Sequence, residues 1–160
     1  MKKLVLLLPV IIVLAISGAA AFAGELVDGN ISLGQDHVQM TWYLVAYEKA
    51  SQETGAPSAT VRKYYTNAGI KNETIELLMS KFGLNAEKAG SLYFTEYRYI
   101  YSTDLKKFAV GYIRHYDMVG NIVHGTEMNG QTEDTKLSWV SIVPKGPSGL
   151  ALDVVRKIKK

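Results

Sequence analysis

The sequence predicts an α+β fold, in which an antiparallel β-sheet arranged as a meander packs with a helical hairpin and a C-terminal helix. Three observations support this fold class. Apolar and polar residues alternate through most of residues 92–143, which is the period of a strand. Apolar residues recur at helical spacing over residues 61–82 and again over 151–158. The connections between the predicted strands are short, which favours antiparallel neighbours.

Residues 1–23 have the three parts of a cleavable secretory signal peptide. Two lysines give a positive start, Leu4–Ile16 is an apolar run, and a stretch of small residues follows. Ala21 and Ala23 suit the −3 and −1 positions that signal peptidase recognises, so we expect cleavage before Gly24.

An uncleaved membrane anchor is the alternative interpretation, because the apolar segment has about the length of a bilayer span. Pro9 interrupts it and no cluster of positive charge follows, which favours cleavage and leaves no membrane span afterwards. Loss of Lys2 and Lys3 lowers the formal net charge from +3 to +1, which gives no indication of nucleic acid as a partner. We therefore expect an exported protein that is periplasmic, secreted or surface-associated.

Two segments follow the predicted signal peptide, and the pattern of the second is much clearer than that of the first. Residues 24–36 are polar and glycine-bearing, which predicts a linker or a weak edge strand. Residues 37–160 are predicted to form a single α+β domain. Within it, Val38–Glu48 alternates and is rich in β-branched and aromatic residues, which predicts a strand.

Two successive apolar stripes at helical spacing predict the helical hairpin. The stripes are Val61, Tyr64, Tyr65 and Ala68, then Ile75, Leu78, Met79 and Phe82. Gly69 and Gly83 follow the stripes, where a left-handed residue ends a helix. Ser58 and Asn72 stand three residues ahead of them, where an N-cap belongs.

Four strands are predicted next, over residues 92–102, 107–117, 121–128 and 137–143. Prolines end the last strand and Ser148 can cap the helix that follows. The apolar stripe of that C-terminal helix is Ala151, Val154, Val155 and Ile158.

A stripe of tyrosines marks one face of the strand over residues 92–102. A four-residue turn would place Tyr101 opposite Phe108, Tyr99 opposite Val110 and Tyr97 opposite Tyr112. One interpretation is an open aromatic platform for a glycan, a peptide or a partner protein. The other is that the helices cover this face. The candidate binding residues are Tyr97, Tyr99, Tyr101 and Tyr112.

The sequence shows no catalytic constellation, and we expect no enzymatic activity, metal or cofactor. His115 and Asp117 share one side of a strand, but no serine lies in a nucleophile elbow, and Asp117 suits a turn. His37 and His124 lack metal-ligand spacing. The chain has no cysteine, which excludes a lipid-modified N-terminal cysteine, a thiolate nucleophile and a cysteine metal site.

The C-terminal half resembles the surface-adhesin protein E-like family. The segment from Tyr116 to Val123 is similar to that family's YD-x-x-Gly turn, and the segment from Trp139 to Ser148 is similar to its W-x-x-I-x-P-x-S segment. The resemblance implies an antiparallel sheet with a packed C-terminal helix, and attachment to host extracellular-matrix and plasma proteins. The chain departs from the family in lacking cysteine and in the inserted residues Gly146 and Pro147.

These observations lead to two expectations of function. The first is an exported, non-enzymatic binding protein with a protein partner, either from the extracellular matrix or from the cell envelope. The alternative is a periplasmic small-molecule carrier with a cystatin-like or NTF2-like cavity lined by the same tyrosines. Pairing of two copies through an exposed edge strand is a further expectation.

Overall fold

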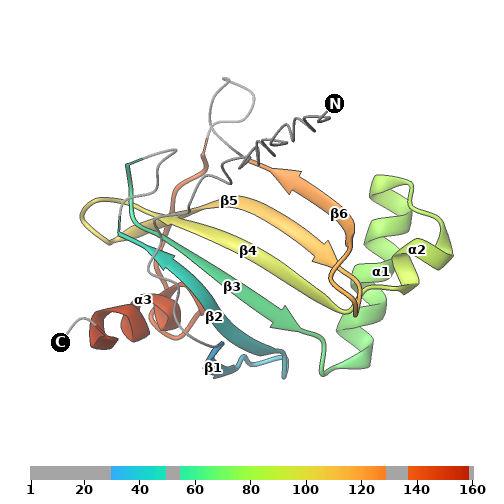
Figure 1. Ribbon diagram of the computed structural model, residues 1–160, viewed down its shortest axis with the longest axis horizontal. Coiled ribbons are helices and arrows are strands. Elements are labelled where there is room, and N and C mark those ends of the chain that lie inside the picture. The colour runs from blue at the N-terminus through green and yellow to red at the C-terminus, as the bar shows by residue number, and fades with distance from the viewer. Residues whose placement is uncertain (1–29, 50–54, 129–136, 159–160) are drawn as a thin grey trace, which may run out of the picture.

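The computed structural model describes residues 30–49, 55–128 and 137–158. Six strands follow one another across a single antiparallel sheet: β1 (Ile31–Gln35), β2 (Thr41–Glu48), β3 (Ser58–Tyr64), β4 (Phe94–Tyr101), β5 (Lys107–Tyr116) and β6 (Ile122–Glu127) (Figure 1). The helices are α1 (Ala68–Phe82), α2 (Ala86–Gly90) and α3 (Pro147–Ile158). The predicted α+β meander with a C-terminal helix is confirmed. The predicted signal peptide lies outside the described residues.

The first of the two helical stripes was assigned to the wrong element. Residues 58–64 form β3, which pairs with β2 on one side and β4 on the other. The segment also alternates, since Ala59 and Val61 are buried on one face, and pairing on both sides outweighs its helical spacing. Ser58 is therefore not an N-cap. It is buried, and its hydroxyl donates to a carboxylate oxygen of Glu48 at 3.2 Å.

The second helical stripe forms α1, and α2 follows it, so two consecutive helices do occupy this part of the chain. The predicted N-cap at Asn72 is wrong, because α1 begins earlier. Asn67 is the N-cap, and its side-chain oxygen accepts hydrogen bonds from two backbone N–H groups of the first turn. The predicted stop at Gly83 is confirmed: its φ is 68°, and its N–H donates to the carbonyl of Met79 at 3.1 Å.

The helices pack on the same face of the sheet, near its two ends (Figure 1). One core lies under α3, where Leu152 and Val155 meet buried side chains of β2, β3 and β4. A smaller core lies under α1 and α2 and contains Leu78, Ala89 and Val123. The opposite face carries no helix within the described ranges, and we call it the open face.

The fourth predicted strand, over residues 137–143, is reduced to β7 (Val140–Ser141), which pairs with β5 and not with β6. The chain then turns tightly into α3. This turn brings Gly149 so close to the carbonyl oxygen of Val143 that a Cβ at this position would overlap it. Ser148 lies inside the first turn of α3, where it is buried, so it is not the cap of this helix. At the other edge of the sheet, β1 is an edge strand, which is one of the two alternatives, a linker or a weak edge strand, predicted for residues 24–36.

Candidate binding surface

Three of the four candidate tyrosines lie on the helix-covered face. Tyr99 and Tyr101 are buried in the core under α3, with 6% and 0% of their surface exposed. The hydroxyl of Tyr101 donates to the backbone carbonyl of Ser148 at 2.8 Å, and burial raises the pKa of both phenols. Tyr97 is half-buried between Tyr99 and Trp42. The helices therefore cover this face of the sheet, and Tyr97, Tyr99 and Tyr101 lie in or beside the core.

Tyr112 lies on the open face because a β-bulge changes the register. Tyr101 lies opposite Phe108 and Tyr99 opposite Val110, as predicted. The register then shifts between Arg98 and Tyr99, so Tyr112 pairs with Arg98 and not with Tyr97. A shift of one residue turns a side chain to the other face of a sheet. The predicted pairing of Tyr97 with Tyr112 is therefore wrong.

The open face carries a cluster of five aromatic rings, which we call the aromatic patch: Tyr43, Tyr64, Tyr93, Phe94 and Tyr116. The ring of Tyr64 lies centrally, 5.6 Å from that of Tyr43, 5.7 Å from that of Tyr93 and 5.4 Å from that of Phe94. Phe94 in turn stacks on Tyr116 with ring centroids 4.8 Å apart. Four strands or their ends therefore contribute to one continuous aromatic cluster, in which Phe94 is buried and the four tyrosines are at least partly exposed.

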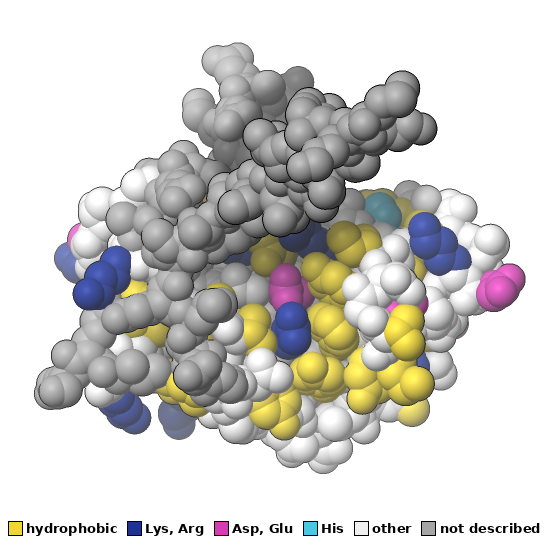
Figure 2. Space-filling view, in the orientation of Figure 1, with side chains coloured by type: hydrophobic (Ala, Val, Ile, Leu, Met, Phe, Trp, Pro, Cys, Tyr) yellow, Lys and Arg dark blue, Asp and Glu magenta, His cyan; other side chains and the backbone are white. Residues whose placement is uncertain are grey.

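A row of paired charges crosses the strands beside the patch. Arg62 donates to the buried carboxylate of Glu96 at 2.9 Å, and the Tyr112 hydroxyl donates to the other carboxylate oxygen at 2.8 Å. Arg114 pairs with Glu127 at 2.8 Å and lies over the ring of Tyr112. Burial and the charge of Glu96 raise the pKa of Tyr112. Figure 2 shows acidic and basic side chains among hydrophobic ones on this face, so its charge is largely compensated from within.

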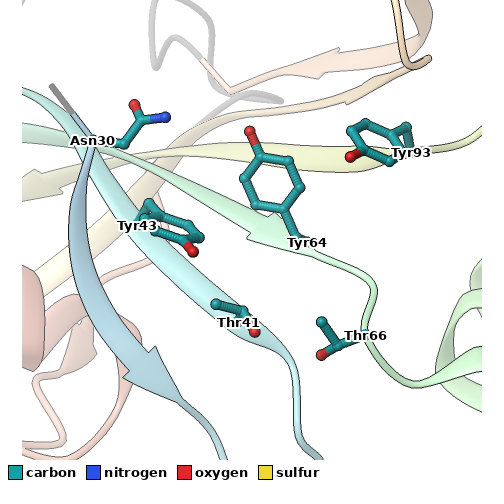
Figure 3. Close-up of a pocket in the computed structure, with 6 residues that line it drawn as sticks. All are labelled: Asn30, Thr41, Tyr43, Tyr64, Thr66 and Tyr93. Atoms are coloured by element: carbon teal, nitrogen blue, oxygen red, sulfur yellow. The ribbon is translucent and has the colours of Figure 1, made fainter.

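A pocket of about 420 Å³ opens at one end of the patch, where β2 begins, β3 ends and the chain enters β4, with Asn30 just ahead of β1 (Figure 3). Its lining residues are Asn30, Thr41, Tyr43, Tyr64, Thr66 and Tyr93. All six are uncharged at neutral pH. Tyr64 stands between the other two tyrosines, and its ring lies almost perpendicular to both, at 90° and 81°. The pocket therefore combines aromatic walls with amide and hydroxyl groups.

A hydrogen-bonded chain of polar groups lies on the covered face. The Tyr65 hydroxyl and that of Thr95 are 2.7 Å apart, and Thr95 Oγ1 lies 2.9 Å from His115 Nδ1. Burial, with smaller contributions from the charges of His124 and Lys63, lowers the pKa of His115 to about 4. His115 is thus a neutral structural group at physiological pH.

His115 and Asp117, which share one side of a strand in the sequence pattern, have different hydrogen-bond partners. The Asp117 carboxylate accepts hydrogen bonds from the backbone N–H groups of Val119 and Asn121, which makes it the turn residue that the sequence predicted. Among the residues that the structure describes, no group of three or more His, Asp or Glu side chains could hold a metal ion.

The aromatic patch is not evident from the sequence patterns, because the helical spacing of residues 61–68 places Tyr64 on a helix. If residues 58–64 are taken as a strand, alternation places Arg62 and Tyr64 on one face. Pairing with β2 then adds Tyr43 and pairing with β4 adds Phe94. That signal was present in the sequence but was outweighed by the helical spacing.

No described helix is long and apolar enough to cross a membrane. A comparison of the chain with protein-family models, curated proteins and solved structures found no match.

Proposed function

We propose that this is a non-enzymatic binding protein that holds a protein partner through the aromatic patch. The observation that carries the proposal is the cluster of five rings on the sheet face that no described helix covers, in which the four tyrosines are at least partly exposed around a buried Phe94. Tyrosine and arginine are enriched where proteins bind one another, because both offer a large contact area together with polar groups. Arg62 adds such a contact, since its guanidinium lies 4.9 Å from the centre of the Phe94 ring.

The charges on this face support a partner that is recognised mainly by shape and apolar contact. The acidic groups Glu96 and Glu127 are each paired with an arginine of the same face. A partner therefore meets little uncompensated charge, and its affinity should depend weakly on salt. The pocket opens onto the patch, which favours a surface contact over the enclosed site of a small-molecule carrier.

The sequence indicates among which classes of protein that partner should be sought. The signal-peptide pattern of residues 1–23 supports export, and the resemblance to the surface-adhesin protein E-like family supports attachment to extracellular-matrix, plasma or envelope proteins. Purified proteins of these three groups are the first panel to test.

The test uses the chain lacking residues 1–23, with binding to the immobilised panel measured by surface plasmon resonance. Tyr116→Ala removes a half-buried ring of the patch, and we expect it to weaken binding at least tenfold. Leu77→Ala is the matched control, because Leu77 is 50% exposed on α1 and lies away from the patch. If the Tyr116→Ala variant and the wild type bind with equal affinity, and circular dichroism shows that both are folded, the patch is not part of the contact surface.

A further inference from the structure

We infer that the pocket beside the aromatic patch binds a neutral sugar ring, so that the partner is a glycan-bearing one. The inference rests on the proposed function, since it assigns the sugar part of the same partner to one end of the same surface. The walls of the pocket, its polar groups and the lack of charge in its lining support the inference.

The walls are aromatic and are held firmly by the sheet. Tyr43 and Tyr64 project from β2 and β3, which are paired along their whole length. Tyr93 directly precedes β4, and its backbone N–H donates to the carbonyl of Tyr116 at 2.7 Å. The near-perpendicular rings present both faces and edges, against which the C–H face of a sugar can pack.

The remaining lining residues offer the hydrogen-bonding groups that sugar hydroxyls need. Asn30 supplies an amide with two donors and an acceptor, and Thr41 and Thr66 supply hydroxyls. The Thr66 hydroxyl already donates to the carbonyl of Gln39, which leaves its oxygen free to accept from a ligand. Three phenol hydroxyls complete a rim that is polar around aromatic walls.

The lack of charge in the lining decides the class of sugar. An anionic sugar would lie against six uncharged side chains, and the cation beside Tyr64, Arg62, is already paired with Glu96, so the sugar would lose hydration without gaining a free counter-charge. A purely apolar side chain of a peptide would make no use of the Asn30 amide or of the remaining hydrogen-bonding capacity of the Thr41 and Thr66 hydroxyls, which already contact Gln35 and Gln39. The volume of about 420 Å³ lies at the low end of the range of about 300–1,000 Å³ for small-ligand sites, which suits one or two sugar units.

The experiment is saturation-transfer NMR with the chain lacking residues 1–23 and a panel of neutral trisaccharides of glucose, mannose, galactose and N-acetylglucosamine. A trisaccharide of glucuronate is the charged comparator. We expect transfer to at least one neutral sugar and none to glucuronate. Transfer to no neutral sugar, or stronger transfer to glucuronate, would overturn the inference.

Variants separate the pocket from the rest of the patch. Tyr93→Ala removes an exposed wall and Thr41→Val removes a hydroxyl at constant shape, and we expect each to lower sugar affinity at least fivefold. Tyr116→Ala lies in the patch but outside the pocket, and we expect it to leave sugar affinity within twofold. Sugar binding that survives both pocket variants overturns the inference. Loss of protein binding in Tyr116→Ala without any sugar binding would retain the proposed function and refute the sugar site alone.

Discussion

Acid should destabilise the fold through His115, over a pH range set by its surroundings. The ring lies on the covered face, where Nδ1 meets the Thr95 hydroxyl, and the titratable groups that face it are His124 from β6 and Lys63 from β3. Burial, then His124, then Lys63 lower its pKa to about 4, from 6.5 in an unfolded chain. The unfolded state therefore binds a proton that the folded state does not, and stability falls as the pH drops from 6.5 towards 4.

The size of this effect follows from the two pKa values. Linkage gives a loss of about 1.4 kcal/mol at pH 5.5 and about 3 kcal/mol at pH 4, relative to pH 7.5. His115 is only partly buried, so solvent screening lowers the loss at pH 4 to about 2–3 kcal/mol. Below pH 4 both states bind the proton, so this contribution stops growing.

The assay is urea unfolding between pH 7.5 and pH 4, with the fluorescence of buried Trp42 as the probe. His115→Asn is the control, because it places a polar atom near the position of Nδ1 and cannot be protonated in this range. Any other contribution to stability that changes with pH is common to the two proteins and cancels in the comparison. The wild type should lose 2–3 kcal/mol more than the variant, by an order-of-magnitude estimate. Parallel curves for the two proteins would refute the reasoning.

Three further predictions concern stability and can be checked by thermal or urea unfolding. Asn67→Ala removes the N-cap of α1 and should lower the free energy of unfolding by about 1–2 kcal/mol. Asn72→Ala, in the exposed interior of the same helix, should stabilise the protein slightly. Similar effects of the two substitutions would contradict the observed helix start. Gly83→Ala forces a side chain into a left-handed conformation and should cost about 1 kcal/mol, whereas Gly90→Ala meets no atom within 4 Å and should be neutral or stabilising. Leu78→Ala empties a fully buried position under α1 and should cost about 2–4 kcal/mol; a loss below about 1 kcal/mol would show that this core is loosely packed.

Of the candidate site, the sequence supplied the residue types but not their positions. It predicted an aromatic sheet face and named Tyr112, which does lie on the open face. The other three candidates are in or beside the core. The aromatic rings that form the patch could be grouped only once their strands were paired, because rings whose centroids lie 4.8–5.6 Å apart in space come from strands far apart in the chain.

The sequence by itself determined the features that depend on local physics. The alternation of β4, β5 and β6, the apolar stripe of α3 and the left-handed stop at Gly83 all follow from neighbours along the chain, and the structure has them all. Asp117 likewise makes its turn through hydrogen bonds to residues two and four positions ahead.

The tertiary structure alone decided the features that depend on pairing between distant segments. Residues 58–64 fit both a helical and a strand period, and only hydrogen bonding to β2 and β4 selects the strand. The bulge opposite Arg98 decides which face Tyr112 occupies. It comes where Gly111 is pressed so closely against Ile100 that a Cβ would lie 2.9 Å from its terminal methyl group. Which face the helices cover is decided in the same way, because burial is a property of the packed sheet and not of any one strand.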